Sequence, residues 1–386
     1  MENKKVILFQ LLFFVCSCGQ DFSPKNIVKT NETIQISEKE KEKNYFAQLF
    51  PKTLLPDISA VFQKNEISNS SKDLRQIFEQ KREIGGGKSG AKILLLETKG
   101  DVHYSLILKT LHPIKNDKDL WSNIAFREIY FSKMLSQLRS KKFLPADMSA
   151  ADFFPDFFGF GTTDSLDPFS PGSKSTDKKI PFYLMEKLEG MTLYDFAINA
   201  KEAKEKFGYN LKEMEVKKIF SIILQMAVAL QNAYKETGFI HLDAHPGNIF
   251  LTTKKMDGII FSGFGREISL VGPKVKIIDF DQSETLNKAT PRPQYKLRPI
   301  LGRGKKLYEA EGGSSLKFSL INLKAIATSE NTDVRMLNVL FHTFDDRFKN
   351  ASGKINIDYF ASTISEFIEF LFKIAPEVGF KNMSLS

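Results

Sequence analysis

Short apolar runs of strand length mark the early part of the chain, and apolar residues with helical spacing mark the later part. Residues 93–96 and 105–108 form two such runs on either side of Lys99-Gly100-Asp101, which is a turn sequence. They predict an antiparallel hairpin, and residues 181–185 predict a further strand. The segment 161–179 is rich in Ser, Thr, Asp, Pro and Gly, and it predicts a loop.

Three segments repeat apolar residues every three or four positions, which predicts helices with one buried face. The first, residues 121–138, places Ile124, Phe131 and Leu135 on one face. The other two stripes are Val216, Ile219, Phe220, Ile223, Ala227, Leu230 and Tyr234, and Ile357, Phe360, Ile364, Phe367, Ile368 and Leu371. Strands followed mainly by helices predict an α+β fold with two lobes rather than an alternating doubly wound sheet.

Composition narrows the class of protein. With 42% hydrophobic and 26% charged residues in 386, the chain can bury a core, which excludes a wholly disordered protein. The net charge of +9 comes from scattered basic residues, so we expect a solvated lysine-rich surface and no nucleic-acid partner. Cys16 and Cys18 are the two cysteines, which excludes a four-cysteine zinc fold and leaves the body without a catalytic thiol.

The start of the chain has the pattern of an export signal. Lys4 and Lys5 precede an apolar run over residues 6–15, and Cys16-Ser17-Cys18 follows. This end resembles a bacterial lipoprotein signal with Cys18 as the lipid acceptor. We therefore expect a signal peptide over residues 1–18, a tether with a helical extension over residues 19–79, and an exported, membrane-anchored protein. A buried N-terminal strand or helix in a cytoplasmic protein is the alternative.

A glycine-rich turn follows the first predicted strand. Gly85, Gly87 and Gly90 have the spacing G-x-G-x-x-G, and such glycines let backbone N–H groups approach a phosphate. A dinucleotide fold would open a helix here, but an apolar run and a hairpin follow instead. A P-loop would need glycine at the position of Arg82. Both alternatives therefore fit the sequence poorly.

Lys109 ends one of the apolar runs, which places its ammonium at the edge of a core. There it needs a carboxylate or a phosphate, unless the side chain only extends into solvent. Glu128 shares the predicted buried helix face, because it lies four residues after Ile124 and three before Phe131. A carboxylate on a buried face requires a cation, so we expect Glu128 to pair with Lys109.

Two polar clusters adjoin later apolar runs. The first is His241-Leu-Asp243-Ala-His245-Pro-Gly-Asn248, and the second begins at Asp279 in Asp-Phe-Asp. Oxygen-bearing side chains such as these suit Mg²⁺ bound together with substrate phosphates. The His-x-Asp-x-His arrangement also offers ligands for a transition metal, although no third histidine lies close by in the sequence.

Taken in order, these features resemble the protein-kinase-like superfamily. The order of these features along the chain is that of the family: the glycine turn, Lys109, Glu128 and then the two clusters. Glu128 lies 19 positions after Lys109, which is similar to the separation in that family. Residues 181–190 look like its strand and hinge between lobes, and residues 331–341 look like its central helix, with Asp333 bracing the catalytic loop. The resemblance implies a small antiparallel β-lobe with one helix over residues 80–187, and a larger, mainly helical lobe over residues 188–386.

The resemblance also implies a role for each matching residue. Asp243 would orient an acceptor hydroxyl and take its proton, and Lys109, paired with Glu128, would hold the α- and β-phosphates of ATP. Mg²⁺ would be bound by Asn248 and Asp279. The nucleotide would further be contacted by Gly85, Gly87, Gly90, Glu186 and Leu188.

The chain departs from the pattern of protein kinases in several places. Asp281 replaces the glycine of D-F-G, and Lys92 stands where a valine is expected, with Ile93 one residue later. The gap between Asn248 and Asp279 implies an inserted hairpin around residues 252–273, and no A-P-E sequence follows. The Asp-x-His-Pro-Gly-Asn form of the loop is more similar to aminoglycoside and choline kinases.

Several functions therefore stay open at this point. An ATP-dependent kinase is favoured, with a protein Ser/Thr hydroxyl slightly ahead of a small-molecule hydroxyl as acceptor. A pseudokinase scaffold would not need Lys109, Asp243, Asn248 and Asp279 together. A plain surface lipoprotein adhesin would bind no nucleotide. Asp281 is expected to be a solvated or capping carboxylate, with metal binding as its alternative.

Overall fold

The computed structural model describes residues 74–75, 78–86, 91–99, 105–111, 124–163, 165–169, 180–285, 300–353, 355, 358–381 and 383–384. All of them belong to one unit, Phe46–Ser386. The predicted signal peptide over residues 1–18 and most of the predicted tether lie outside the described residues. Gly87 and Gly90 of the glycine-rich turn also lie outside them.

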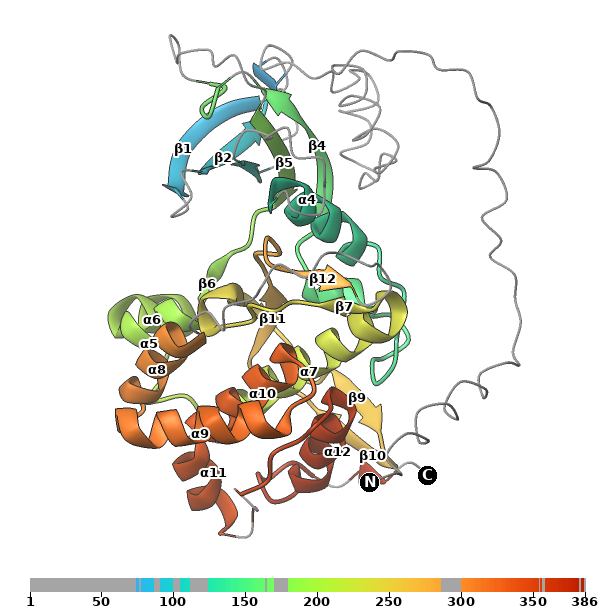
Figure 1. The fold of residues 1–386 in the computed structure, drawn as a ribbon, viewed down its shortest axis with the longest axis vertical. Coiled ribbons are helices and arrows are strands. Elements are labelled where there is room, and N and C mark those ends of the chain that lie inside the picture. The colour runs from blue at the N-terminus through green and yellow to red at the C-terminus, as the bar shows by residue number, and fades with distance from the viewer. Residues whose placement is uncertain are drawn as a thin grey trace, which may run out of the picture. The chain divides into compact units, whose positions relative to one another are not determined.

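A five-stranded antiparallel sheet forms the first part of the described chain (Figure 1). Its strands are β1 (Phe78–Gly86), β2 (Lys92–Thr98), β3 (Ser105–Thr110), β4 (Phe157–Thr163) and β5 (Ile180–Glu186), in the order β1-β2-β3-β5-β4. The predicted hairpin is confirmed, because β2 and β3 pair antiparallel with Leu94 opposite Leu108. The prediction of a loop from residue 161 is wrong at its start, since residues 161–163 pair with β5 and bury Thr163.

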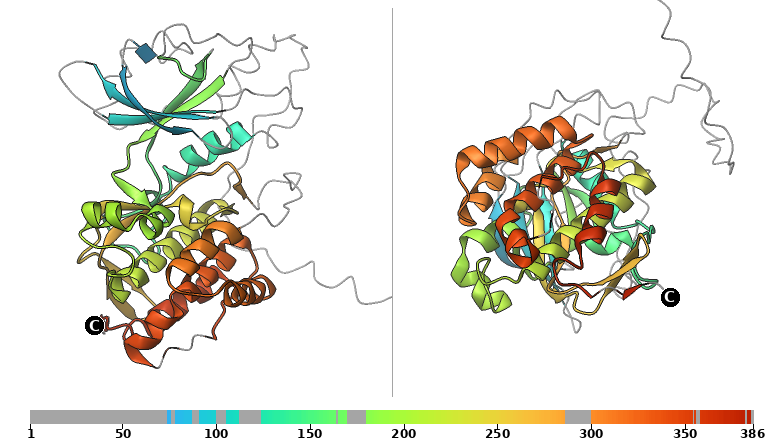
Figure 2. Two further views of the ribbon diagram at one scale, coloured as in Figure 1. Left: turned by 90° about the vertical axis from the view of Figure 1, so that its left-hand side faces the viewer. Right: turned by 90° about the horizontal axis from the view of Figure 1, so that it is seen from below.

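The sheet has a hydrophobic core of its own, and the following helix belongs mainly to a second core. Leucines of β2, β3 and β5 pack in the first core with Phe78, Phe158 and Phe182. Helix α4 (Ile124–Leu135) lies between the sheet and the helices (Figures 1 and 2), and its Phe131 and Leu135 join the second core. Ile124 was expected on the same buried face but is 46% exposed, because it stands at the first residue of the helix.

Helices make up most of the rest. They are α5 (Leu193–Ile198), α6 (Ala200–Phe207), α7 (Val216–Thr237), α8 (Ile300–Ala310), α9 (Ser315–Thr328), α10 (Thr332–Thr343), α11 (Asp345–Ser352) and α12 (Ile364–Ile374). The helix predicted over residues 216–234 is confirmed, but it is buried on all sides rather than on one face, since every residue of α7 from Ile219 to Ala233 is buried. Gly238 ends this helix in a left-handed conformation that glycine adopts without strain.

The last predicted helix starts later than its apolar pattern indicates. Thr363 caps α12 by accepting the N–H of Glu366, so Phe360 precedes the helix. The Phe360 ring instead stacks on His342, with ring centroids 4.0 Å apart. Ile357 lies outside the described residues. The predicted helix was too long because Phe360, a partly buried loop residue, continues the helical spacing of apolar residues.

Short strands support the polar clusters. Strands β6 (Gly190–Thr192), β8 (Ile249–Lys255) and β11 (Pro273–Ile277) form one sheet, and β7 (Phe239–Ile240) pairs with β12 (Glu284–Thr285). The predicted inserted hairpin is confirmed as β9 (Ile260–Gly263) and β10 (Arg266–Ser269), which pair with each other, and β13 (Met383–Ser384) adds to β10.

The predicted α+β class is confirmed, and the two larger hydrophobic cores of the described residues are compatible with two lobes. In the part of the chain that the structure describes, no helix is both long and apolar enough to cross a membrane.

Candidate functional site

Lys109 lies on one face of the sheet together with residues of the two neighbouring strands. It is directly opposite Ile93 in β2 and Tyr183 in β5. Directly paired residues of antiparallel strands share a face of the sheet. The apolar residue beside Lys109 on this face is therefore Ile93, whereas the side chain of Lys92 belongs to the other face.

The Lys109 ammonium bridges two carboxylates from distant parts of the chain. It forms an ion pair with Glu128 of α4, and its Nζ lies 3.1 Å from Oδ1 of Asp279. Tyr183 donates its hydroxyl to Glu128 Oε1 at 2.8 Å. Glu128 is only 2% exposed, so these contacts replace its hydration. The structure thus brings three predicted site residues together and adds Tyr183.

Burial and the neighbouring charges shift the pKa values of Lys109 and Glu128 in opposite directions. Burial alone would lower the pKa of Lys109, but the carboxylates of Glu128 and Asp279 hold that pKa well above its usual range. Burial raises the pKa of Glu128 to about 7, although the Lys109 ammonium opposes the rise. Lys109 therefore keeps its charge, and Glu128 is the member of the pair that titrates first as the pH falls.

The loop at 241–248 is held in place by Asp333, which lies in the first turn of α10. The buried Asp333 carboxylate accepts the backbone N–H groups of His241 at 2.8 Å and Leu242 at 3.1 Å. Leu242 has a φ of 65°, a conformation that costs a non-glycine residue energy unless its surroundings impose it. The two hydrogen bonds supply that constraint, so the bracing role expected for Asp333 is visible in the contacts.

The two histidines of this loop direct ring nitrogens to the backbone. His241 Nε2 lies 3.0 Å from the carbonyl of Ile278, and His241 Nδ1 accepts the N–H of Asp243 at 3.3 Å. His245 Nδ1 accepts the N–H of Gly247 at 3.1 Å. These bonds use three of the four ring nitrogens, and no group of three His, Cys, Asp or Glu residues able to hold a metal occurs among the described residues. The transition-metal alternative therefore does not fit.

Asp243 projects from the loop as a part-exposed carboxylate. Burial, together with the neighbouring Asp279 and Asp281 carboxylates, raises the pKa of Asp243 to about 6, although the His241 and Arg303 side chains oppose the rise. A carboxylate with such a pKa is mostly ionised at neutral pH and still accepts a proton readily. The loop therefore presents a carboxylate whose pKa suits a general base.

Asn248 and Asp279 offer the oxygen atoms that a hard cation prefers. Asn248 Nδ2 donates to the carbonyl of Asp243 at 2.9 Å, which leaves its Oδ1 available to a ligand. Asp279 has a φ of 68° and its side chain is 39% exposed, so its carboxylate remains open to solvent. Burial disfavours its charge, but Lys109 lowers its pKa below the usual value. The pair fits Mg²⁺ completed by phosphate oxygens and water.

The residues after Asp279 tie it to the rest of the site. Phe280 is buried against His241 and Phe154, with ring centroids 5.6 and 6.1 Å away. The carbonyl of Asp281 accepts a hydrogen bond from Arg127 Nε of α4 at 2.9 Å. Burial and the neighbouring Asp279 raise the pKa of the Asp281 carboxyl. Arg127 thus connects the helix that carries Glu128 to the segment that carries Asp279.

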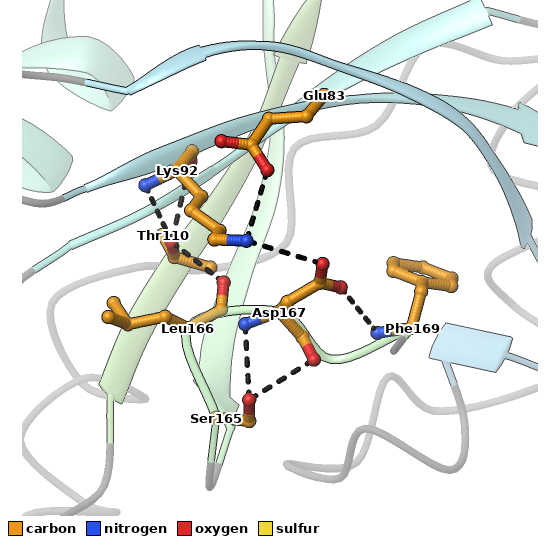
Figure 3. Close-up of polar contacts among 7 residues, drawn as sticks. All are labelled: Glu83, Lys92, Thr110, Ser165, Leu166, Asp167 and Phe169. Atoms are coloured by element: carbon orange, nitrogen blue, oxygen red, sulfur yellow. Dashed lines mark hydrogen bonds and ion pairs between the residues drawn. The ribbon is translucent and has the colours of Figure 1, made fainter. Parts of the chain in front are cut away.

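The described part of the glycine turn adjoins a polar network (Figure 3). Lys92 Nζ lies 3.0 Å from Glu83 and 3.5 Å from Asp167, and Thr110 accepts the Lys92 N–H while donating to the Leu166 carbonyl. This network joins β1, β2 and β3 to residues 165–169, and it gives the Lys92 ammonium two carboxylate partners. Gly85 pairs with Ile93 in β1, and a Cβ placed on it would meet no atom within 4 Å.

Glu186 and Leu188 lie beside a cavity of about 410 Å³ that Lys109, Asp243 and Asp279 do not line. The Glu186 carboxylate is 2.9 Å from Lys276 Nζ. Its side chain is therefore already paired, so a nucleotide contact at these two positions would use the main chain.

The sequence patterns did not identify Tyr183, Arg127 or Arg303 as site residues. Tyr183 lies in a predicted strand, but only the pairing of β3 with β5 places it opposite Lys109. Arg127 is next to Glu128 in the sequence, which says nothing of its bond to Asp281. Arg303 comes from α8 and lies 3.3 Å from His245 Nε2. No motif spacing connects it to the loop.

Comparison with known proteins finds similarity over a short stretch of the chain. No protein-family model matches the chain. A serine/threonine-protein kinase of Caenorhabditis elegans is 33% identical over 84 residues, which is 22% of this chain and 8% of that protein. The chain thus covers a small fraction of the relative's length. The match indicates a kinase-like relationship over that stretch and no more.

Proposed function

We propose that this protein is an ATP-dependent phosphotransferase of the protein-kinase-like superfamily that acts on a hydroxyl group. The observation that carries the proposal is the meeting of Lys109 with both Glu128 and Asp279 beside the loop of Asp243 and Asn248. These residues come from a strand, a helix and two separate loops. The partial similarity to a serine/threonine-protein kinase supports the same class.

Each residue has a physical role in this proposal. Lys109 supplies a permanent cation for the α- and β-phosphates, and Glu128 with Tyr183 fixes its position. Asn248 and Asp279 would hold Mg²⁺, which supplies charge neutralisation of the phosphates when bound. Phosphoryl transfer depends mainly on position and charge, so a rigid array of this kind suits it.

Asp243 handles the acceptor. It would accept a hydrogen bond from the attacking hydroxyl, align its oxygen with the γ-phosphorus, and take the proton as the new P–O bond forms. The two backbone hydrogen bonds to Asp333 hold the loop, so Asp243 is positioned before the acceptor arrives.

A protein Ser/Thr hydroxyl is the acceptor that we slightly favour, with a small-molecule hydroxyl as the alternative suggested by the His245-Pro246-Gly247 sequence. A catalytically silent scaffold is the third outcome. We further propose export and lipidation at Cys18. A Cys18→Ser variant should lack the lipid in mass spectra of the N-terminus, and an intact Met1 on the native protein would contradict the signal.

The decisive experiment is incubation of the full chain with γ-labelled ATP, Mg²⁺ and a mixed cell lysate. Label on proteins supports the favoured acceptor, and label on small metabolites supports the alternative. An Asp243→Asn variant serves as the control and should transfer no label. Equal labelling by the variant and the wild type, or none by the folded wild type, would contradict the proposal.

A further inference from the structure

The loop that carries Asp243 contains no lysine or arginine between His241 and Asn248. A transferring phosphoryl group spreads negative charge over its oxygens, and a cation beside it lowers the barrier. Lys109 is assigned to the α- and β-phosphates under the proposed function. Apart from the Mg²⁺ that Asn248 and Asp279 would hold, a side-chain cation for the phosphoryl group itself would come from another element.

Arg303 of α8 is the cation that lies against this loop. Its Nη1 lies 3.3 Å from Nε2 of His245, and the same Nε2 lies 3.8 Å from Oδ2 of Asp243. A Cβ placed on Gly247 would meet Arg303 Nη1 at 2.1 Å and Cζ at 2.9 Å. The absence of a side chain at Gly247 is thus what lets the guanidinium lie on the loop.

His245 does not offer this guanidinium a hydrogen-bond acceptor. Its Nδ1 accepts the N–H of Gly247, so the neutral ring carries its proton on Nε2. Two N–H groups then face each other across 3.3 Å, and neither accepts a hydrogen bond.

The other described neighbours of Arg303 do not supply the negative charge that a guanidinium pairs with. Its Cζ lies 5.7 Å from the centre of the Tyr194 ring, which stabilises a cation weakly and leaves the N–H groups of its fork unused. Across the described ranges, no carboxylate lies within ion-pair distance of Arg303, whereas Lys305 on the same helix approaches Glu309 at 3.7 Å. A planar guanidinium placed in this way matches the oxygens of a phosphate group.

We infer that Arg303 is a further catalytic residue, whose guanidinium binds the γ-phosphoryl group while it moves to the acceptor held at Asp243. The inference rests on the proposed phosphotransferase function. In the step, the acceptor oxygen bonds to the γ-phosphorus and the bond to the β,γ-bridging oxygen breaks. The hydroxyl proton passes to Asp243 and ADP leaves with the bridging oxygen. Arg303 contributes charge and exchanges no proton.

The test uses the full chain and measures binding of Mg²⁺–ADP with and without aluminium fluoride, which mimics the phosphoryl group in transfer. Calorimetry should show that Arg303→Met leaves the Kd for Mg²⁺–ADP within about twofold and weakens the mimic by ~10²–10³-fold, the usual cost of one such donor. Arg303→Lys should lose less affinity for the mimic than Arg303→Met. Lys305→Met is the matched control, and its affinity for the mimic should not change. Thermal unfolding of each variant checks the fold.

A double-mutant cycle tests the position of Arg303 on Gly247. The backbone of Gly247 is not in the left-handed region, so alanine fits its conformation. Gly247→Ala should weaken binding of the mimic in the wild type and cause little further loss in Arg303→Met. Independent losses that multiply would contradict this contact.

The outcomes separate the two claims. If the folded wild type binds neither nucleotide form, the proposed function and the inference both fail. If the wild type binds the mimic and Arg303→Met binds it equally well, the phosphotransferase proposal stands and the role of Arg303 is refuted.

Discussion

The two halves of the candidate site are held by different forces. The loop of Asp243 is fixed by the buried Asp333 carboxylate, which accepts the backbone N–H groups of His241 and Leu242. The contact between Lys109 and Asp279 instead joins a strand of the sheet to a segment outside it through charge. The first half is preorganised by its surroundings, whereas the second depends on three ionised groups remaining together.

Packing reinforces this contrast. Phe131 of α4 contacts Phe239, and Phe239 contacts Phe280, with ring centroids 5.4 and 6.2 Å apart. Helix α4 and the segment of Asp279 therefore share one apolar core with β7, the strand that precedes the Asp243 loop. Lys109 and Tyr183 reach the site from the sheet, which has a separate core. We expect changes at the charged contact to affect phosphate binding more than folding.

The largest effect is expected at the preorganised half. Asp243→Asn keeps the shape of the side chain but removes the base, so kcat should fall by ~10²–10⁴-fold, the usual contribution of general base catalysis. The unfolding midpoint should change little, because the carboxylate is part-exposed. Single-turnover transfer of labelled phosphate measures the loss, and a variant within threefold of the wild type would refute the role of Asp243.

Lys109→Met breaks the charged half. It should lower phosphoryl transfer by ~10²–10³-fold, because an electrostatic contact to developing phosphate charge is worth that much. Its matched control is Lys92→Met, since Lys92 is the neighbouring β2 lysine on the other face of the sheet. Near-normal transfer by Lys109→Met, or an equal loss in both variants, would show that the bridge is not part of the site.

The pH dependence should reveal both halves. Glu128 and Asp243 must be ionised to act, and burial raises their pKa values to about 7 and about 6. Activity should therefore decline as the pH falls through about 7, and more steeply below about 6, where both groups take up protons. Measuring kcat/KM from pH 5 to 9 checks this, and a flat profile down to pH 5 would contradict both assignments.

The smallest effect is expected in the polar network of Figure 3. Lys92→Met removes the contacts to Glu83 and Asp167. The Lys92 side chain is 32% exposed, and exposed ion pairs contribute less than about 1 kcal/mol. The free energy of unfolding in urea should change by no more than that. A larger loss would show that residues 165–169 are essential to the sheet.

The sequence pointed to those residues of the candidate site that lie in short motifs. Lys109 and Glu128 were found because strand and helix patterns placed both at core edges, and Asp243, Asn248 and Asp279 because their spacing is recognisable. Arg303 escaped this reasoning because its contact with His245 depends on how α8 packs, which no local spacing encodes. Tyr183 was missed because a strand register decides which residue faces Lys109.

The fold followed the same rule. The hairpin and α7 were predicted correctly because their periodicity is long and regular. The start of α12 was not, because Phe360 is an apolar loop residue that happens to continue the helical register. The periodicity predicted Ile124 to be buried, but Ile124 is the first residue of α4 and is exposed. Periodicity identifies elements, and tertiary packing decides their ends.

The most direct test of the central claim is calorimetric titration of the full chain with ATP, with and without Mg²⁺. The account predicts one site whose affinity depends on Mg²⁺, and a loss of most of that dependence in Asp279→Asn, because an amide offers a cation no full charge. Binding without any effect of Mg²⁺, unchanged binding in Asp279→Asn, or no binding by the folded wild type would contradict the account.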